Sequence, residues 1–105
     1  MKSLHPHQLK EMLDRNDDIQ IIDVREPFEY EICHLHAELI PVGKVLDNIE
    51  KVNTSKPVIV YCHHGIRSAR VIAMLEEQFQ LENLYNLRGG IHAWAEEIDS
   101  HMATY

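Results

Sequence analysis

The residues best suited to chemistry form one stretch of seven: Cys62, His63, His64, Gly65, Ile66, Arg67 and Ser68. A thiol becomes a nucleophile when it ionises, and converging backbone N–H groups or a helix N-terminus favour the thiolate. The stretch follows an apolar, β-branched run at residues 58–61 and leads into an amphipathic helix pattern. This placement predicts that Cys62 is a reactive cysteine in an anion-binding loop.

The other residues of this loop suit the same purpose. Gly65 supplies conformational freedom, and the following helix supplies unpaired N–H donors. Arg67 carries a permanent positive charge, directed either at an anionic substrate or at a carboxylate that holds the loop, for which Glu26 and Glu29 are candidates. Ser68 is expected to cap the turn or to donate a hydrogen bond to the thiolate. The competing interpretation, an inert buried cysteine, is disfavoured by this combination of residues.

The elements around the loop must bring a strand end and a helix start together. Apolar runs predict strands over residues 19–24, 37–42, 57–61 and 83–87. Helical spacing predicts helices from Pro6, from Pro27 to Ile32, over residues 45–52, from Ser68 to Phe79 and from Ile91 to Ile98. Strands that alternate with helices indicate a three-layer α/β/α fold with a central, mostly parallel sheet of about five strands.

In such sheets, ligands bind beyond the carboxyl ends of the strands. Cys62 follows a strand directly, and so do the segment 23–26 and the glycine pair 89–90. We therefore expect these three segments at one rim, ordered by Asp23, Arg25 and Glu26 through a salt bridge or N–H contacts. The alternative is a solvated cluster of charges.

The second cysteine, Cys33, is expected at the opposite rim, because it ends a helix and precedes a strand. A five-residue strand separates the rims by about 17 Å, too far for a disulfide with Cys62. The histidines beside the cysteines, at 34, 36, 63 and 64, do not match the spacing of a structural zinc site, so no metal is predicted. The scattered histidines, His92 among them, are expected at the surface.

Bulk properties narrow the function further. A length of 105 residues indicates one domain, residues 1–105. The net charge of −7 argues against a nucleic-acid or membrane partner, since both need a basic surface. The sequence shows neither a membrane-length apolar run nor a signal peptide, and two cysteines are more often free thiols than a disulfide in a reducing compartment. We therefore expect a cytoplasmic protein.

Three motifs together resemble the rhodanese-like sulfurtransferase family: the loop 62–68, the stretch 23–30 and the stretch 87–94. The resemblance runs from about Leu4 to Glu97. It implies that the Cys62 thiolate takes a sulfane sulfur from thiosulfate or a persulfide, and that the loop stabilises the resulting persulfide. A thiophilic acceptor, either a small molecule or a sulfur-carrier protein, then removes the sulfur. The resemblance implies no cofactor.

The loop also separates this chemistry from its alternatives. Four residues lie between Cys62 and Arg67, whereas cysteine-dependent phosphatases, which are chemically similar, have five. The shorter loop suits a single sulfur atom and disfavours a small phosphatase. A non-catalytic binding module of the same fold is the other alternative. Many active members carry Arg or Lys directly after the cysteine, where this chain has His63 and His64. We therefore expect the preferred donor to be something other than thiosulfate, and we expect activity to rise as these imidazoles protonate.

Overall fold

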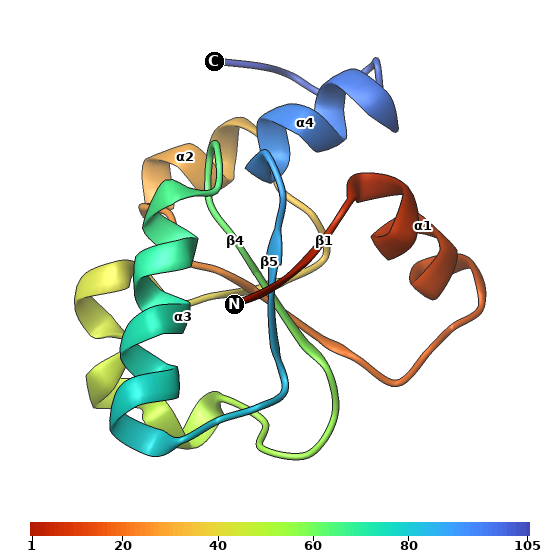
Figure 1. The fold of residues 1–105 in the computed structure, drawn as a ribbon. Coiled ribbons are helices and arrows are strands. Elements are labelled where there is room, and N and C mark those ends of the chain that lie inside the picture. Colours follow the sequence, from red (N-terminus) through yellow and green to blue (C-terminus); the bar gives the residue numbers. More distant parts are fainter.

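Five parallel strands lie in the order β1-β5-β4-β2-β3 at the centre of the protein, whose computed structural model describes residues 1–105 (Figure 1). They are β1 (Lys2–Leu4), β2 (Gln20–Asp23), β3 (Glu38–Leu39), β4 (Val58–Tyr61) and β5 (Leu84–Leu87). Every neighbouring pair is parallel. The predicted α/β fold, with a mostly parallel sheet of about five strands, is confirmed.

Helical segments connect these strands and cover both faces of the sheet (Figure 1). They are α1 (Pro6–Asp14), α2 (Pro27–Ile32), the 3-10 helices η1 (Val42–Lys44) and η2 (Leu46–Lys51), α3 (Ile66–Phe79) and α4 (Gly90–Glu97). Val71, Ile72 and Leu75 of α3 share one hydrophobic cluster with the 3-10 segment. Leu9 of α1 and Trp94 of α4 belong to a second cluster. The sheet therefore lies between two helical layers.

The strand before the reactive loop, β4, is buried along its whole length. Successive side chains of a strand point to opposite faces, so β4 contributes to both cores. Val58 and Val60 pack into the cluster under α3, and Ile59 and Tyr61 pack into the cluster under α1 and α4. Because its side chains pack into the cores on both faces of the sheet, β4 fixes the position of Cys62, which follows it directly.

The segment 45–52 differs from the predicted α-helix and forms a 3-10 helix with a kink at Asn48. The Asn48 side chain is the cause. Its Nδ2 donates to the Lys44 carbonyl at 2.8 Å, which is the acceptor that an α-helical backbone N–H of Asn48 would use. The Asn48 N–H donates instead to the carbonyl of Val45 at 3.0 Å, the spacing of a 3-10 turn.

Three other elements also depart from the sequence-based expectation. The edge strand β1 was not predicted, because Lys2 and Ser3 are exposed and the strand is held by main-chain pairing with β5. The strand expected over residues 37–42 shrinks to the two residues of β3, at the other edge of the sheet. Phe79, the last residue of α3, is 40% exposed and does not join the buried face of its helix.

The register of the sheet brings the functional segments together. Asp23 at the end of β2 pairs with Tyr61 at the end of β4, and Val60 pairs with Asn86 of β5. The carboxyl ends of all three strands lie at the same rim of the sheet, where the stretches 24–26, 62–67 and 88–90 begin. No helix of the structure has the length and apolar character needed to span a membrane.

Candidate functional site

The loop after β4 wraps around the sulfur of Cys62. The backbone N–H groups of Gly65 and Ser68 donate to Cys62 Sγ at 3.1 and 3.4 Å. Gly65 has the left-handed φ of 99° that the turn into α3 requires, and glycine adopts it without strain. Cys62 is only 1% exposed. The sulfur therefore lies at the floor of a loop whose amides converge on it, at the N-terminus of α3.

The hydroxyl of Ser68 is the third group on the sulfur, with Oγ 3.3 Å from Cys62 Sγ. The same hydroxyl donates to Asn86 Oδ1 at 2.6 Å, while Asn86 Nδ2 donates to the Gly65 carbonyl at 3.1 Å. Asn86 thus ties the end of β5 to both sides of the loop. Asn86 was not among the predicted site residues, although a polar residue at the carboxyl end of a strand beside the reactive loop was a usable signal.

The N-terminus of α4 holds the outer side of the loop. The N–H of Ile91 donates to the Cys62 carbonyl at 2.9 Å, and the N–H of His92 donates to the His63 carbonyl at 3.1 Å. This contact depends on Gly90, which has φ 63°. A Cβ there would lie 2.3 Å from the His63 oxygen and 2.5 Å from the Cys62 oxygen. With the two carbonyls turned outward to α4, the loop amides can face the sulfur.

Arg67 pairs with Glu29 and does not stand free to bind an anion. Its Nη1 and Nη2 donate to Glu29 Oε1 and Oε2 at 2.7 and 2.9 Å, which is the bidentate geometry that guanidinium and carboxylate favour. The hydrogen bonds from Arg67 outweigh burial and lower the pKa of Glu29 to about 2. Of the two carboxylates expected for this role, Glu29 fills it. The Glu26 side chain is exposed and belongs to the capping box of α2, and the Glu26 backbone N–H donates to Glu29 Oε1 at 3.1 Å.

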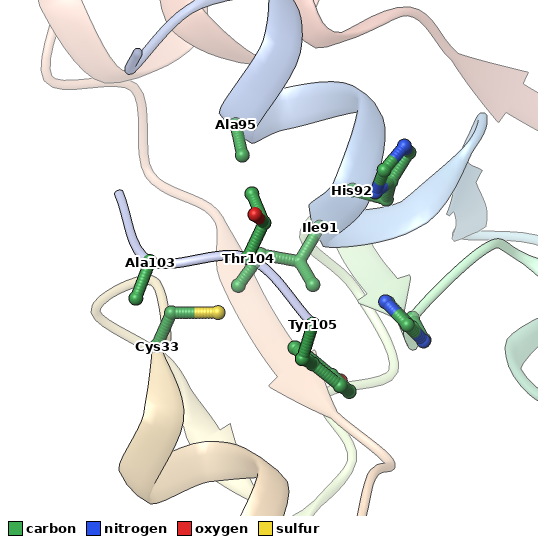
Figure 2. Close-up of a pocket in the computed structure, with 8 residues that line it drawn as sticks. Cys33, Ile91, His92, Ala95, Ala103, Thr104 and Tyr105 are labelled. Carbon is green, nitrogen blue, oxygen red and sulfur yellow. The ribbon is translucent and has the colours of Figure 1, made fainter. Parts of the chain in front are cut away.

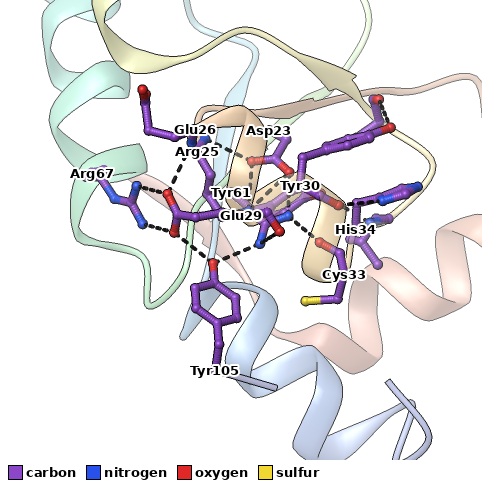
Figure 3. Close-up of polar contacts among 12 residues, drawn as sticks. Asp23, Arg25, Glu26, Glu29, Tyr30, Cys33, His34, Tyr61, Arg67 and Tyr105 are labelled. Carbon is purple, nitrogen blue, oxygen red and sulfur yellow. Dashed lines mark hydrogen bonds and ion pairs between the residues drawn. The ribbon is translucent and has the colours of Figure 1, made fainter. Parts of the chain in front are cut away.

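Arg25 is the centre of a buried polar network beneath this pair (Figure 3). Its Nε and Nη2 donate to the two carboxylate oxygens of Asp23 at 3.0 and 2.7 Å. It also donates to the carbonyls of Glu29 and Cys33 and to the Tyr105 hydroxyl. Burial opposes the charge on Arg25, but these hydrogen bonds outweigh it and raise its pKa. The network fixes α2 against the carboxyl end of β2.

Tyr105 closes the network from the far end of the chain. Its hydroxyl donates to Glu29 Oε2 at 2.8 Å, and burial raises the pKa of Tyr105 to about 12, so it keeps this proton at neutral pH. Its ring stacks on His63, with centroids 3.8 Å apart and planes at 7°. Burial, together with the neighbouring His64, lowers the pKa of His63. Nothing in the sequence pattern pointed to Tyr105, because it lies outside every predicted element.

The two remaining loop side chains face outward, since His64 is exposed and Ile66, the first residue of α3, is 63% exposed. His92, which was expected to be a surface residue, is half-buried beside the loop. These positions leave the mouth of the loop lined by imidazoles, where an arginine or lysine side chain would provide a permanent charge.

The prediction that Cys33 lies at the opposite rim is wrong. Cys33 lines a narrow crevice together with His63, His92 and Tyr105, and its carbonyl accepts a hydrogen bond from Arg25 (Figure 2). The helix α2 explains this position. It has six residues, or about 9 Å of rise, which is too short to carry the chain back to the rim at the amino ends of the strands. Both cysteines are free thiols.

The arrangement can stabilise negative charge on the sulfur of Cys62 and on an atom attached to it. The donors on Sγ are the amides of Gly65 and Ser68, and the partial positive charge of the α3 N-terminus adds to them, whereas the Ser68 hydroxyl gives its one proton to Asn86 Oδ1. Arg67 and Glu29 shape the loop rather than neutralise a ligand.

Comparisons with known proteins bear on this site. The rhodanese-like domain profile matches residues 5–97. The thiosulfate sulfurtransferase GlpE of Coxiella burnetii is 40% identical over 83 residues, which cover 78% of this chain and 77% of that protein. The probable adenylyltransferase/sulfurtransferase MoeZ of Mycobacterium tuberculosis is 31% identical over 106 residues, which cover 98% of this chain. The chain spans 27% of the length of MoeZ. A rhodanese-like domain protein from Staphylococcus aureus has a TM-score of 0.83 and 34% identity, covering 93% of this chain and 95% of that one.

Proposed function

Because this chain belongs to the rhodanese-like domain family, we propose that it is a sulfurtransferase working through a persulfide on Cys62. It takes a sulfane sulfur from thiosulfate or a persulfide and passes it to a thiophilic acceptor. We further propose that residues 1–105 form one such domain, that it acts in the cytoplasm, where its two free thiols stay reduced, and that it needs no cofactor for this reaction.

The observation that carries this proposal is the convergence of the Gly65 and Ser68 amides on Cys62 Sγ. Hydrogen bonds to a thiolate favour the charged form, which is the nucleophile. A loop with four residues between Cys62 and Arg67 is sized for one added atom. We propose that these amides also stabilise the negative charge of a persulfide formed on Cys62.

The reaction proceeds in two half-reactions that balance. In the first, the Cys62 thiolate attacks the outer sulfur of the donor, forming a new S–S bond. The donor's own sulfur bond breaks and its electron pair leaves with sulfite, or with a thiolate when the donor is a persulfide. In the second, an acceptor nucleophile attacks the outer sulfur, and the Cys62 thiolate leaves. Each product departs before the next substrate reacts, so we expect ping-pong kinetics.

The mouth of the loop supports a persulfide as the preferred donor. Thiosulfate is a dianion, and the side chains at the mouth are imidazoles, while the Arg67 charge is already paired with Glu29. A donor that places less negative charge at the mouth loses less binding affinity from the absence of a free positive charge there. The acceptor is a small thiol or a sulfur-carrier protein, and neither a nucleic acid nor a membrane is proposed as a partner, given the net charge of −7.

Mass spectrometry of the intact protein tests the proposal. The reduced protein is incubated separately with thiosulfate and with glutathione persulfide, and the modified peptide is mapped. We expect one added sulfur atom on Cys62, removed by cyanide as thiocyanate. Cys33→Ser is the matched control and keeps the adduct, whereas Cys62→Ser loses it.

The same samples separate the alternatives. No adduct with either donor would leave a non-catalytic binding module as the better description, and an adduct that persists in Cys62→Ser would place the chemistry elsewhere. Hydrolysis of an aryl phosphate by the parent protein, abolished in Cys62→Ser, would instead support a phosphatase.

A further inference from the structure

Three histidine side chains from two separate segments meet beside the Cys62 loop. His63 and His64 belong to the loop, and His92 comes from the first turn of α4. One ring nitrogen of each lies within 4.8 Å of a ring nitrogen of the other two. The ring centroid of His64 lies 3.9 Å from that of His63 and 5.0 Å from that of His92. Because α4 binds the loop carbonyls through its backbone, main-chain contacts hold the two segments that carry these histidines together.

Two of these imidazoles have a buried nitrogen with no hydrogen-bond partner. They are His63 Nε2 and His92 Nδ1. The other nitrogen of His92, Nε2, is paired with Glu96 Oε1 one turn later on α4. That pairing places the ring proton on Nε2 and leaves a lone pair on Nδ1. A buried nitrogen without a partner costs free energy, and an ion bound to both nitrogens would remove that cost.

We propose that His63, His64 and His92 form a site for a borderline divalent transition-metal ion, with Zn²⁺ as the best match. Imidazole nitrogens are ligands that Zn²⁺ favours, and three of them leave a fourth coordination position open. The unpartnered nitrogens of His63 and His92 are the donors we assign, and His64 supplies the third. Glu96 then orients His92 from behind, in the way that carboxylates commonly support a metal-bound histidine.

The three imidazoles must move closer together to hold the ion. Zn–N bonds of about 2.0–2.1 Å place the nitrogens of a tetrahedral site about 3.4 Å apart. The widest separation here, 4.8 Å, must therefore close by about 1.4 Å. The ring centroids that lie farthest apart are those of His63 and His92, at 6.0 Å, so these two side chains must rotate as well as the exposed His64.

This site differs from the cysteine–histidine cluster considered in the sequence analysis. It contains neither thiol: Cys62 Sγ is engaged by the loop amides and Ser68, and Cys33 and His92 lie on opposite sides of the crevice in Figure 2. Its third donor comes from α4, which only the fold brings to the loop. The inference concerns nitrogen donors alone, so it does not depend on the proposed sulfur transfer.

Metal titration of a thiol-free protein tests the site. The double variant Cys33→Ser/Cys62→Ser removes both sulfur ligands, and Zn²⁺ binding is measured by calorimetry. We expect one ion per chain. Co²⁺ as a spectroscopic probe is expected to give the visible bands of a tetrahedral nitrogen site without the near-ultraviolet charge-transfer band of a thiolate ligand.

Substitutions in that background identify the donors. His92→Ala and His64→Ala are each expected to weaken Zn²⁺ binding more than about tenfold, and Glu96→Gln by about 10–100-fold through the loss of support for His92. His101→Ala, an exposed histidine outside the cluster, is the control and keeps the parent affinity. Because His64 is exposed, its replacement leaves the fold intact and gives a result even if His92→Ala fails to fold. Equal affinity in the parent and in His64→Ala, or no stoichiometric binding in the parent, would overturn the proposal.

Discussion

At the scale of single residues, the side chain directly after the cysteine sets the charge that an incoming donor meets. His63 is partly buried, stacks on Tyr105, and has a lowered pKa, so it adds no positive charge at neutral pH. The expected gain in activity on imidazole protonation therefore moves, for His63, to a more acidic range than that of an ordinary histidine. Tyr105 also offers a face on which a planar cation could stack.

The substitution His63→Arg is expected to raise kcat/KM for thiosulfate by about tenfold, which is the effect of one additional charged hydrogen bond of about 1.4 kcal/mol. The value for a persulfide donor should change less. Steady-state rates with both donors, measured with a chelator present, check this expectation. His63→Gln, polar but uncharged, is the matched control and should not show the gain. An equal rise for Gln and Arg would contradict the role of charge.

At the scale of elements, the loop and α4 behave as one unit. The first N–H groups of a helix usually find side-chain or solvent partners, but in α4 two of them bind the carbonyls of Cys62 and His63. In this contact the two loop carbonyls lie so close to Gly90 that there is no room for a Cβ atom on that residue. A pair of glycines in the sequence indicates a turn, but not what the turn touches.

Gly90→Ala is expected to destabilise the protein by more than about 2 kcal/mol, because it combines a positive φ with a clash against two carbonyl oxygens. Urea unfolding measures the loss. Gly43→Ala is the matched control, since a Cβ at Gly43 has no atom within 4 Å, and its unfolding midpoint should stay close to that of the parent. Similar losses for the two variants would show that the close approach at Gly90 is not the cause.

The elements that were predicted well from the sequence are those whose pattern of apolar residues reflects how they are buried. β4 is apolar throughout because both of its faces are buried, and this pattern is visible in four residues. The edge strand β1 has no such pattern, because only its main chain joins the sheet. The kink at Asn48 depends on one side chain that competes for the Lys44 carbonyl, and apolar spacing does not report that competition.

At the scale of the whole molecule, Glu29 connects parts of the chain that are far apart in sequence. It lies on α2, pairs with Arg67 on α3 and accepts a hydrogen bond from Tyr105 (Figure 3). The sequence predicted that the carboxyl ends of the strands would meet at one rim, because parallel topology dictates it. It misplaced Cys33 because the path of the chain after a six-residue helix depends on tertiary contacts, including the hydrogen bond from Arg25.

Because of this network, the free energy of unfolding depends on pH. The pKa of Glu29 is about 2 in the folded protein against 4.5 for an ordinary glutamate, so its contribution is complete above about pH 4.5 and is lost as the pH falls toward 2. That shift corresponds to about 3 kcal/mol. We expect Glu29→Gln to be less stable than the parent at pH 7, with a difference that narrows between pH 4.5 and pH 2.

Urea unfolding at several pH values measures this convergence. Glu31→Gln, an exposed carboxylate on the same helix, is the control and should follow the parent at every pH. A stability difference between Glu29→Gln and the parent that stays constant down to pH 2 would show that the carboxylate charge is not what Glu29 contributes.

The near-complete burial of Cys62 has a consequence for how the protein survives its own reactivity. A nucleophilic thiolate is also the form that peroxides convert to sulfenic and then irreversible sulfinic acids. With Cys62 only 1% exposed, the resting sulfur reacts with a donor or with a peroxide only when the loop and the side chains above it move. A sulfur atom bonded to Sγ stands about 2 Å farther out. Movement at the mouth of the loop would thus control both the loading of Cys62 and its oxidation, whereas the loaded sulfur needs less of this movement to meet its acceptor.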